Sequence, residues 1–499
     1  MTTEQRTEQP GAQPSDEPRI LKMVIGGEQV DAADGQTFDV VNPANGRLIA
    51  KAPLGGREDV DRAVAAAQKA FDDPKGFASW SASKRGRTLQ KLSGLVKANM
   101  EELAQLESQN IGKPIKSARG EAFAVSLVFE YYAGAANKLL GETIPVSAPG
   151  LDFTLREPIG VVGLIVPWNF PMNMASWKLG PALATGNTCI LKPASYSPMT
   201  AIRLGELALE AGFPPGVVNV VTGPGGTVGA SMAAHEGIGK IAFTGETTTG
   251  QEIMRLASGN VKRISLELGG KSPNVVFADA DLERFSAESP YSVFDNCGQD
   301  CCARSRILVE RSAHERVVEL FSAATRKVVV GDPSDDATEV GPMVSLRQRE
   351  RVLDYIGVGQ EEGAELVVGG GPPEDKSLAD GAYVMPTIFD NVGIDMRISR
   401  EEIFGPVVSI IPFDTEEEAV RLANATPYGL SGSVWSRDIG KAIRVAKRVR
   451  AGVLSINTNN SVHTEAPFGG YKMSGMGREL GMHALELYTE VKNIFVDLR

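Results

Sequence analysis

Residues 159–192 read IGVVGLIVPWNFPMNMASWKLGPALATGNTCILK, and this stretch decides the fold class. Ile159–Val166 is a short run of mostly apolar, β-branched residues, which predicts a buried strand. Asn173–Thr185 predicts a helix that Gly186 would end, and Thr188–Leu191 is a second apolar run of strand length. The order strand, helix, strand is typical of two parallel strands joined by a crossover helix.

The same alternation continues as far as Phe277. A helix is expected to begin at Ser197-Pro198, with Ser197 as its N-cap and Pro198 in its first turn, and to end at Gly212. Further strands are predicted at Val217–Val221, Lys240–Phe243 and Arg263–Leu268. Alternation of this kind predicts an α/β fold in which helices cover both faces of a parallel sheet. Ligands of such sheets bind at the carboxyl ends of the strands.

An amphipathic helix is expected upstream of this region. Apolar residues recur at helical spacing from Arg87 to Asn110, which predicts one continuous helix. Gly112 and Pro114 follow the pattern and should end the helix. Nothing in its sequence indicates a role other than packing against the rest of the domain.

The composition limits the class of protein. A chain of 499 residues is expected to form about three domains, and 42% hydrophobic with 23% charged residues is ordinary for a globular protein. The formal net charge of −11 argues against binding to nucleic acid or to an anionic membrane. No apolar run is long enough to span a bilayer. Residues 1–18 are rich in Thr, Glu, Gln and Pro and are expected to be a disordered tail.

The cysteines argue against disulfides and metal sites. The chain has 4 cysteines, which are too few for a disulfide framework, and their spacings match no common zinc site. No metal is therefore expected, and a reducing cytoplasm suits the chain best. Cys189 lies in an apolar run and is expected to be a buried strand residue.

Two motifs with chemical implications lie further along the chain. Residues 294–306 read FDNCGQDCCARSR and fit the pattern F-x-N-x-G-Q-x-C-x-A-x-x-R at every fixed position. Residues 266–273 read LELGGKSP. Together these motifs resemble the cysteine and glutamate signatures of the NAD(P)-dependent aldehyde dehydrogenase family. The resemblance extends from about Lys22 to the C-terminus.

The resemblance implies a domain organisation. It implies a Rossmann-type cofactor-binding domain formed by residues 19–141 and 159–268, and an α/β catalytic domain formed by residues 269–468. It also implies a small β-flap, residues 142–158 and 484–499, that extends the sheet of a neighbouring subunit. A homo-dimer or homo-tetramer is therefore expected, and the C-terminal run NIFVDL suits an edge strand that needs a partner.

The resemblance also assigns the chemistry. Cys301 alone has the G-Q-x-C spacing and is expected to be the nucleophile that adds to the aldehyde; Cys297 and Cys302 are weaker candidates. A PWNFP loop places Asn169, with the Cys301 backbone N–H, as the oxyanion hole. Hydride transfer to NAD or NADP would leave a thioester, and Glu267 is expected to activate the water that hydrolyses it.

Other interpretations of these residues stay open. Glu267 could instead form an ion pair with Lys262 or Arg263, and Asn169 could simply form a turn between two prolines. A non-catalytic relative, kept for binding or for structure, would be expected to lose Cys301, Glu267 or Asn169. Relatives that transfer the acyl group to coenzyme A generally lack the glutamate. All three residues are present here, which favours a hydrolytic enzyme.

The expected cofactor site departs from the family pattern at two positions. Ser195 stands where a glutamate commonly binds the ribose hydroxyls, which predicts a relaxed or NADP-leaning choice of cofactor; the alternative is a preference for NAD with a weaker hold. Glu246 replaces a usual serine and is expected to point outward or to cap a helix that begins near Thr247 and offers N–H groups to an anion. Gly250 is expected to allow tight helix packing. The expected cofactor residues are Ile165, Trp168, Lys192, Ser195, Gly225, Thr244, Gly245, Glu246, Glu402 and Phe404.

Two acidic residues bear on the substrate. Asp295 and Asp300 flank the nucleophile, where relatives that take aliphatic aldehydes often have aromatic or apolar residues. If both faced the entrance of the site, they would attract a cationic aldehyde such as an aminobutyraldehyde or betaine aldehyde. The alternative is that they are solvated or structural acids in an enzyme of broad aliphatic and aromatic range. The expected substrate-binding residues are Phe170, Met174, Trp177, Asp295, Asp300, Cys302, Val462 and Phe468.

Overall fold

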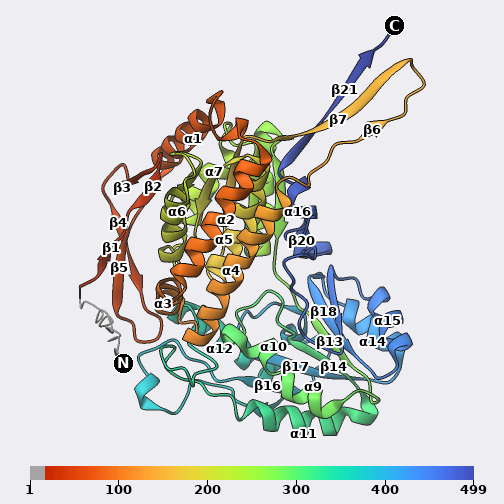
Figure 1. The fold of residues 1–499 in the computed structure, drawn as a ribbon. Coiled ribbons are helices and arrows are strands. Elements are labelled where there is room, and N and C mark those ends of the chain that lie inside the picture. Colours follow the sequence, from red (N-terminus) through yellow and green to blue (C-terminus); the bar gives the residue numbers. More distant parts are fainter. Residues whose placement is uncertain (1–16) are drawn as a thin grey trace, which may run out of the picture.

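The computed structural model describes residues 17–499 and is built on two large sheets covered by helices (Figure 1). One sheet has eight strands and the other has seven. Two three-stranded sheets lie at the edges of the molecule. The predicted α/β class is confirmed, whereas residues 1–16 of the predicted tail lie outside the described residues.

The eight-stranded sheet contains the strands that the sequence predicts between residues 159 and 268. Its strands are β2 (Met23–Ile25), β3 (Glu28–Val30), β8 (Val161–Ile165), β9 (Thr188–Lys192), β10 (Val218–Val220), β11 (Lys240–Thr244), β12 (Arg263–Glu267) and β20 (Gly475–Met476). Their order is β20-β12-β11-β8-β9-β10-β2-β3, and β12 through β10 run parallel. The register pairs Ile165 with both Lys192 and Phe243, so the carboxyl ends of three strands meet at one edge.

Helices cover both faces of this sheet. They are α1 (Arg57–Asp72), α2 (Ala82–Ala98), α4 (Ile115–Ala135), α5 (Pro171–Thr185), α6 (Met199–Ala211), α7 (Ala230–Ala234) and α8 (Thr247–Ala257). In β8, Val162 and Leu164 pack in one core with α2, α4, α5 and α6, whereas Val161 and Ile165 pack in a second core with α1, α7 and α8. This alternation is the two-residue period of a strand that is buried on both faces.

The predicted helix from Arg87 to Asn110 is wrong in one respect, because it is two helices. α2 ends at Ala98 and α3 spans Met100–Ile111. Asn99 lies between them at φ −104° and ψ 21°, outside helical geometry. Its side chain donates to the Leu95 carbonyl at 2.8 Å, a local hydrogen bond of the kind that competes with continuation of a helix.

The start of α6 also differs from the prediction. The helix begins at Met199, and the Ser197 hydroxyl, expected to cap it, is buried with no hydrogen-bond partner among the described residues. The Met199 N–H donates instead to the side chain of Asn110 in α3, at 3.2 Å. The cap therefore comes from a residue distant in sequence, which a local capping motif cannot reveal.

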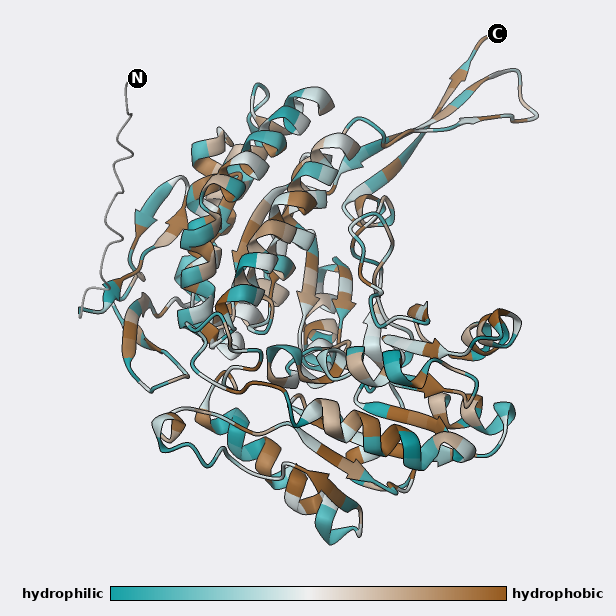
Figure 2. Cartoon of the chain, turned by 60° about the horizontal axis from the view of Figure 1, so that its bottom comes forward, coloured by the Kyte–Doolittle hydropathy of each residue, from teal (hydrophilic) through white to brown (hydrophobic). Residues whose placement is uncertain are grey.

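The seven-stranded sheet follows in the chain. Its strands are β13 (Pro273–Val276), β14 (Arg306–Glu310), β15 (Glu365–Val368), β16 (Thr387–Asp390), β17 (Val407–Phe413), β18 (Ser431–Trp435) and β19 (Val453–Ile456). The order is β15-β16-β17-β14-β13-β18-β19, and only β15 pairs antiparallel. The helices of this region are α9 (Leu282–Glu288), α10 (Tyr291–Phe294), α11 (His314–Thr325), α12 (Leu346–Glu361), α13 (Arg397–Arg400), α14 (Glu416–Asn424) and α15 (Ile439–Arg448). Figure 2 shows apolar strands in the interior and helices with polar outer faces.

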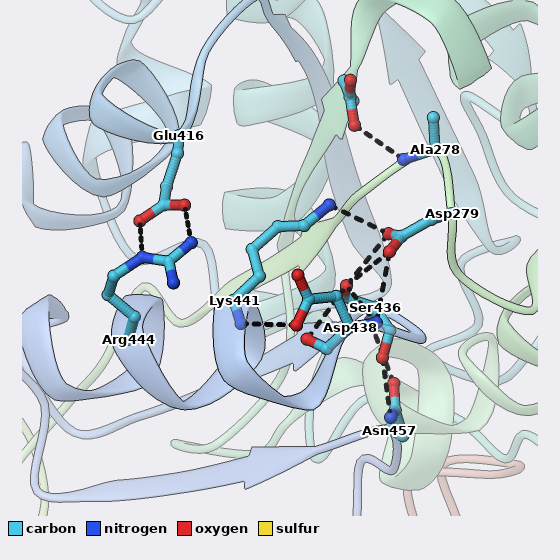
Figure 3. Close-up of polar contacts among 9 residues, drawn as sticks. Ala278, Asp279, Glu416, Ser436, Asp438, Lys441, Arg444 and Asn457 are labelled. Atoms are coloured by element: carbon cyan, nitrogen blue, oxygen red, sulfur yellow. Dashed lines mark hydrogen bonds and ion pairs between the residues drawn. The ribbon is translucent and has the colours of Figure 1, made fainter.

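Polar contacts fix the start of α15 and join it to α14 (Figure 3). Asp438 caps α15 by accepting a hydrogen bond from the Lys441 backbone N–H at 3.0 Å. Asp279, which follows β13, accepts from the Asp438 N–H at 3.2 Å and pairs with the Lys441 ammonium at 3.3 Å. Glu416 of α14 accepts two hydrogen bonds from Arg444 of α15, at 2.9 and 2.7 Å. These contacts hold together the loops that follow β13 and β18.

A hairpin and the C-terminal strand project away from both large sheets (Figures 1 and 2). This flap sheet contains β6 (Thr143–Ile144), β7 (Gly150–Pro158) and β21 (Thr489–Asp497). β21 pairs antiparallel with β7 along its whole length, from Thr489 opposite Pro158 to Asp497 opposite Gly150. Residues just before β21 form α16 (His483–Glu486), whose Ala484 and Leu485 are buried in the core of the eight-stranded region.

The remaining small sheet lies near the N-terminus of the described chain. It joins β1 (Arg19–Ile20), β4 (Thr37–Val41) and β5 (Leu48–Pro53), and it packs through Val40, Ala50 and Ala52 against Leu106 and Met199. Within residues 17–499, no helix combines the length and the apolar character that a membrane span requires.

Candidate active site

A cavity of about 360 Å³ lies where the two large sheets face each other. Its walls come from the carboxyl ends of β8, β11 and β12 and from segments that precede β13, β14 and β17. Residues that follow strands of the eight-stranded sheet and residues that precede strands of the seven-stranded sheet therefore meet at one site. The lining residues are Pro167, Trp168, Asn169, Phe170, Asn173, Met174, Trp177, Thr244, Gly245, Glu246, Glu267, Leu268, Gly269, Asp300, Cys301, Cys302, Gln348, Arg351, Glu402, Phe404, Val462 and Phe468.

An unusual turn brings Cys301 to the cavity. Asn296, Cys297 and Gly298 all have left-handed backbone conformations, with φ of 49°, 58° and 68°. A Cβ atom at Gly298 would lie 2.2 Å from the Gly405 carbonyl oxygen, so only glycine fits there. Backbone of this kind persists only where its surroundings hold it, and it is found most often at functional sites.

Two amides of the cysteine motif hold this turn. The Asn296 side chain donates to the Asn169 carbonyl at 2.8 Å, and the Gln299 side chain donates to the Asn296 carbonyl at 2.9 Å. Gln299 Oε1 also accepts from the Val344 N–H at 2.8 Å. The Asn169 side chain in turn donates to the Gln299 carbonyl at 2.9 Å. Neither Asn296 nor Gln299 was predicted to have a role, although their fixed places in the motif were a signal that the turn needs them.

The cysteines separate into two groups. Cys301 and Cys302 line the cavity, whereas Cys189 and Cys297 are fully buried elsewhere, as predicted for Cys189. Burial raises the pKa of Cys297 to about 12. The hydrogen bond with Cys302, burial, and the nearby charges of Cys302 and Asp300 raise the pKa of Cys301 well above its ordinary value. Ligand atoms of Asp300, Cys301 and Cys302 lie within 4.8 Å of one another, so a thiophilic metal ion held there would block Cys301.

Glu267 is the last residue of β12 and is 5% exposed. Its Oε2 atom has no hydrogen-bond partner among the described residues. Burial and the neighbouring charge of Glu479 raise the pKa of Glu267 well above its ordinary value, against the opposite effects of Lys178 and Arg478. A buried carboxylate without a partner is costly, which is typical of a functional group rather than a structural one.

The alternative ion pair of Glu267 is not formed. Arg263 is paired with Glu490 on the flap strand instead. Lys262 donates to the Ala233 carbonyl at 2.7 Å. Both cations therefore have other partners, and the suggestion that either one neutralises Glu267 is wrong.

Lys178 and Glu479 form a buried ion pair beside Glu267 that the sequence analysis missed. Lys178, in α5, is fully buried and also donates to the Thr244 hydroxyl at 2.6 Å. The only signal was a lysine within an otherwise apolar helix, and its partner lies far away in sequence. The pair holds Thr244 and places one charge of each sign next to Glu267.

The expected substrate residues line the cavity, with one exception. Phe170, Met174, Trp177, Asp300, Cys302, Val462 and Phe468 are all at its wall. The rings of Trp177 and Phe468 meet edge to face, with centroids 5.1 Å apart. Asp300 accepts a hydrogen bond from the Cys302 N–H at 2.9 Å, which fixes its carboxylate next to the thiols.

Asp295 does not line the cavity, and its predicted place at the entrance to the substrate site stays a prediction. Its side chain is exposed and accepts from the Asn296 N–H at 2.9 Å. The left-handed turn that follows directs the next residues inward and leaves Asp295 outside. Two positions that both flank Cys301 in sequence therefore face different surroundings.

The expected cofactor residues fall into an inner and an outer set. The inner set lines the cavity and consists of Trp168, Thr244, Gly245, Glu246, Glu402 and Phe404. The Trp168 and Phe404 rings meet edge to face at 5.3 Å, and Phe404 has φ of 58°. Burial raises the pKa of Glu402 to about 7, although its carboxylate accepts from the Gly270 N–H at 3.0 Å.

The outer set, Ile165, Lys192, Ser195 and Gly225, does not line the cavity. Ile165 and Lys192 are register partners at the ends of β8 and β9, and burial lowers the pKa of Lys192 to about 8. A Cβ atom at Gly229, in the turn of helix that starts at Gly225, would lie 3.7 Å from Lys192 Cδ. The Ser195 hydroxyl donates to the Gly223 carbonyl at 3.1 Å.

Helix α8 begins at Thr247 as expected, and two further cavity residues come from α12. The predicted tight packing at Gly250 is confirmed, since a Cβ atom there would lie 2.7 Å from Leu268 Cδ2. Gln348 of α12 donates to the Phe404 carbonyl at 3.0 Å, and Arg351 lies on the same helix. Neither was predicted, because nothing in the local sequence of α12 indicates that it reaches a cavity.

The comparison with known proteins agrees with this geometry. Residues 30–494 match the aldehyde dehydrogenase family. The chain is 46% identical over 474 residues to the betaine aldehyde dehydrogenase of Bacillus subtilis, covering 95% of this chain and 96% of that protein. It is 45% identical over 487 residues to the mitochondrial aldehyde dehydrogenase of Rattus norvegicus, covering 97% and 93%.

Solved structures show the same architecture. The betaine aldehyde dehydrogenase of Staphylococcus aureus in complex with NAD+ superposes with a TM-score of 0.94 at 40% identity, covering 95% of each chain. An NAD-dependent aldehyde dehydrogenase from Sinorhizobium meliloti gives a TM-score of 0.94 at 43% identity, covering 96% of this chain and 95% of the other. The chain therefore belongs to the aldehyde dehydrogenase family and is an NAD(P)-dependent aldehyde dehydrogenase.

Proposed function

We propose that the enzyme oxidises an aldehyde to a carboxylic acid in this cavity, through a covalent intermediate on Cys301. The observation that supports this most is that Cys301, Glu267 and Asn169, from three separate segments, line one cavity. Thioester chemistry needs a nucleophile, a base and a donor to the oxyanion, and these residues supply the three groups.

The first step is addition of the Cys301 sulfur to the carbonyl carbon. The thiol gives its proton to a solvent water molecule, the thiolate forms a C–S bond with the carbonyl carbon, and the carbonyl π electrons move onto oxygen. The Asn169 amide uses one of its two hydrogens on the Gln299 carbonyl, so the second can stabilise the oxyanion. A preorganised donor of this kind contributes about 3 kcal/mol. Because Cys301 must stay reduced, we also propose a reducing cytoplasm as the compartment.

The inner cofactor set fits the nicotinamide end of NAD or NADP. The cofactor, when bound, accepts the hydride that leaves the tetrahedral adduct. Trp168 and Phe404 would confine the ring, and the Glu402 carboxylate could accept a hydrogen bond from the ribose. The start of α8 at Thr247 offers free N–H groups to the pyrophosphate.

The outer cofactor set is proposed to hold the adenosine end. Lys192 lies at the carboxyl edge of the sheet, where ligands of parallel sheets bind. The Ser195 hydroxyl hydrogen is already used on the Gly223 carbonyl, so it has no proton left for a 2′-phosphate. Ser195 also carries no charge that would repel this phosphate. We therefore propose NAD as the main cofactor, with NADP tolerated.

The second half-reaction is hydrolysis of the thioester by water that Glu267 activates. The Glu267 Oε2 atom has no hydrogen-bond partner within residues 17–499 and can accept the water proton. The water oxygen attacks the acyl carbon, the C–S bond breaks, and the thiol and the carboxylate product separate. Burial and Glu479 raise the pKa of Glu267, which makes it a stronger base than an exposed glutamate.

The cavity also supports a cationic aldehyde as the substrate. Phe170, Trp177 and Phe468 form an aromatic wall, and Asp300 adds a carboxylate to the same cavity. Aromatic faces and a carboxylate together stabilise an ammonium group. The two betaine aldehyde dehydrogenases among the relatives are consistent with this class of substrate.

The charge of the substrate can be tested with a matched pair of aldehydes, each assayed with NAD and with NADP. Betaine aldehyde and 3,3-dimethylbutanal have the same shape and differ in one positive charge. We expect kcat/KM to favour betaine aldehyde, and Asp300→Asn to reduce that preference about fivefold. Glu252→Gln is the control and should leave the ratio unchanged, because Glu252 is exposed and does not line the cavity. Preference for the neutral aldehyde would instead support a broad-range enzyme.

The flap sheet is proposed to join a second copy of the chain. Leu151, Val491, Phe495 and Val496 are between 39% and 55% exposed although they lie in paired strands. Apolar side chains on a projecting sheet need a partner surface. This supports a homo-dimer or homo-tetramer.

Sedimentation of the purified protein tests the role of the flap. We expect a dimer or a tetramer, and we expect Val491→Glu with Phe495→Glu to dissociate it, because two charges would be buried at the contact. Val261→Glu is the control, since Val261 is 89% exposed and lies outside the flap. A wild-type monomer, or an intact oligomer in the double variant, would contradict the proposal.

A further inference from the structure

We propose that Glu246 and Arg351 form a charged bridge across the cofactor cleft, and that this bridge competes with the pyrophosphate of the cofactor. The inference rests on the cofactor site proposed above. It concerns the carboxylate of Glu246 and an arginine that the sequence motifs did not indicate.

The two side chains reach the cavity from opposite sides. Glu246 is the N-cap residue of α8 on the eight-stranded side, and Arg351 belongs to α12, which packs in the core of the seven-stranded region. Arg351 Nη1 lies 4.0 Å from Glu246 Oε1, and both residues line the cavity. The Glu246 side chain makes no capping hydrogen bond to α8. It therefore spans the cleft toward Arg351 instead of satisfying its own helix.

The bridge lies close to a residue that is proposed to contact the cofactor. Burial is the main cause that raises the pKa of Glu402 to about 7; Arg351 opposes this effect and Glu246 adds to it. Both members of the bridge are therefore near enough to affect the charge of Glu402. All three residues line the same cavity.

The start of α8 attracts negative charge, since its first N–H groups have no partner within the helix. Glu246 supplies such a charge before any cofactor is present. A pyrophosphate that binds at Thr247 would be repelled by Glu246 and attracted by Arg351. When the cofactor binds, the Arg351 guanidinium must then leave the Glu246 carboxylate and pair with the pyrophosphate. Glu246 is thus expected to weaken cofactor binding, and Arg351 to strengthen it.

Equilibrium binding of NADH to the full-length oligomer tests this exchange, with the fluorescence of bound NADH as the signal. We expect Glu246→Gln and Glu246→Ser each to lower Kd about fivefold at low salt, and Arg351→Gln to raise Kd by a similar factor. Both effects should shrink at high salt, because the groups are partly exposed. In the double variant the gain from Glu246→Gln should be smaller, because no arginine is left to release.

A control variant on the same helix makes the result specific. Glu252→Gln removes the same charge from α8, but Glu252 pairs with Arg255 on the exposed surface and does not line the cavity. It should leave Kd unchanged. Wild-type binding with an unchanged or higher Kd in both Glu246 variants would overturn the bridge while leaving the cofactor site intact. Failure of the wild type to bind NADH would reject the cofactor site and the bridge with it.

Discussion

Replacing Cys301 with alanine should lower the rate of aldehyde oxidation at least about ten-thousand-fold, because the covalent route then has no nucleophile. The remaining thiol in the cavity, Cys302, has its backbone N–H fixed on Asp300 and does not hold the nucleophile position of the cysteine motif. The measurement is the initial rate of NADH formation with saturating aldehyde and NAD.

The matched control is Cys302→Ala, which should retain most of the activity. The hydrogen bond with Cys302 is the largest cause of the raised pKa of Cys301, so this variant should also lower that pKa. Cys301 should then react faster with iodoacetamide near neutral pH, because more of it is thiolate. Full activity in Cys301→Ala, or an equal loss in both variants, would contradict the assignment of the nucleophile.

The second large effect is expected for Glu267→Gln, which should separate the two half-reactions. Hydride transfer does not need this carboxylate, so each active site should form one NADH in a rapid burst. Steady turnover should then fall about a thousand-fold, because a glutamine cannot accept the proton of the attacking water. Stopped-flow recording of NADH fluorescence shows both phases. Steady turnover at the wild-type rate would remove Glu267 as the base.

The pH dependence follows from the same carboxylate. Glu267 must be ionised to accept a proton, and burial with Glu479 raises its pKa well above 4.5. The wild-type steady-state rate should therefore fall as the pH decreases through this raised pKa, well before an exposed glutamate would protonate. The slow residual turnover of Glu267→Gln should not show this fall in rate at low pH. If the variant still shows the fall, another titrating group must cause it.

Much of the eight-stranded region could be predicted from the sequence, and the physical reason is burial. Strands such as β8 and β9 are buried on both faces, so they are continuous apolar runs that stand out between glycines. The predictions of helix ends were wrong where a hydrogen bond seen only in the structure determines where the helix begins or ends. Asn110 caps α6 from another helix, and the Asn99 side chain, where α2 ends, donates to the Leu95 carbonyl.

The active site also contains residues that the sequence could predict and residues that it could not. The motifs predicted Cys301, Glu267 and Asn169, and the structure brings them to one cavity. Lys178 and Glu479 were missed, because the position of each as a buried partner depends on the other. The sequence also did not show that Asp300 lines the cavity wall while Asp295 does not, since the direction of each side chain depends on a left-handed turn that the residue types do not reveal.

The central claim is that the acyl group is held on Cys301 and released through Glu267. The most direct test is the intact mass of Glu267→Gln after brief mixing with aldehyde and NAD, followed by peptide mapping. We expect an added acyl group of the substrate on the peptide that contains Cys301, one per subunit, and none when Cys301→Ala is combined with Glu267→Gln. An acyl group on Cys302, or no adduct during a full burst of NADH, would exclude a thioester on Cys301.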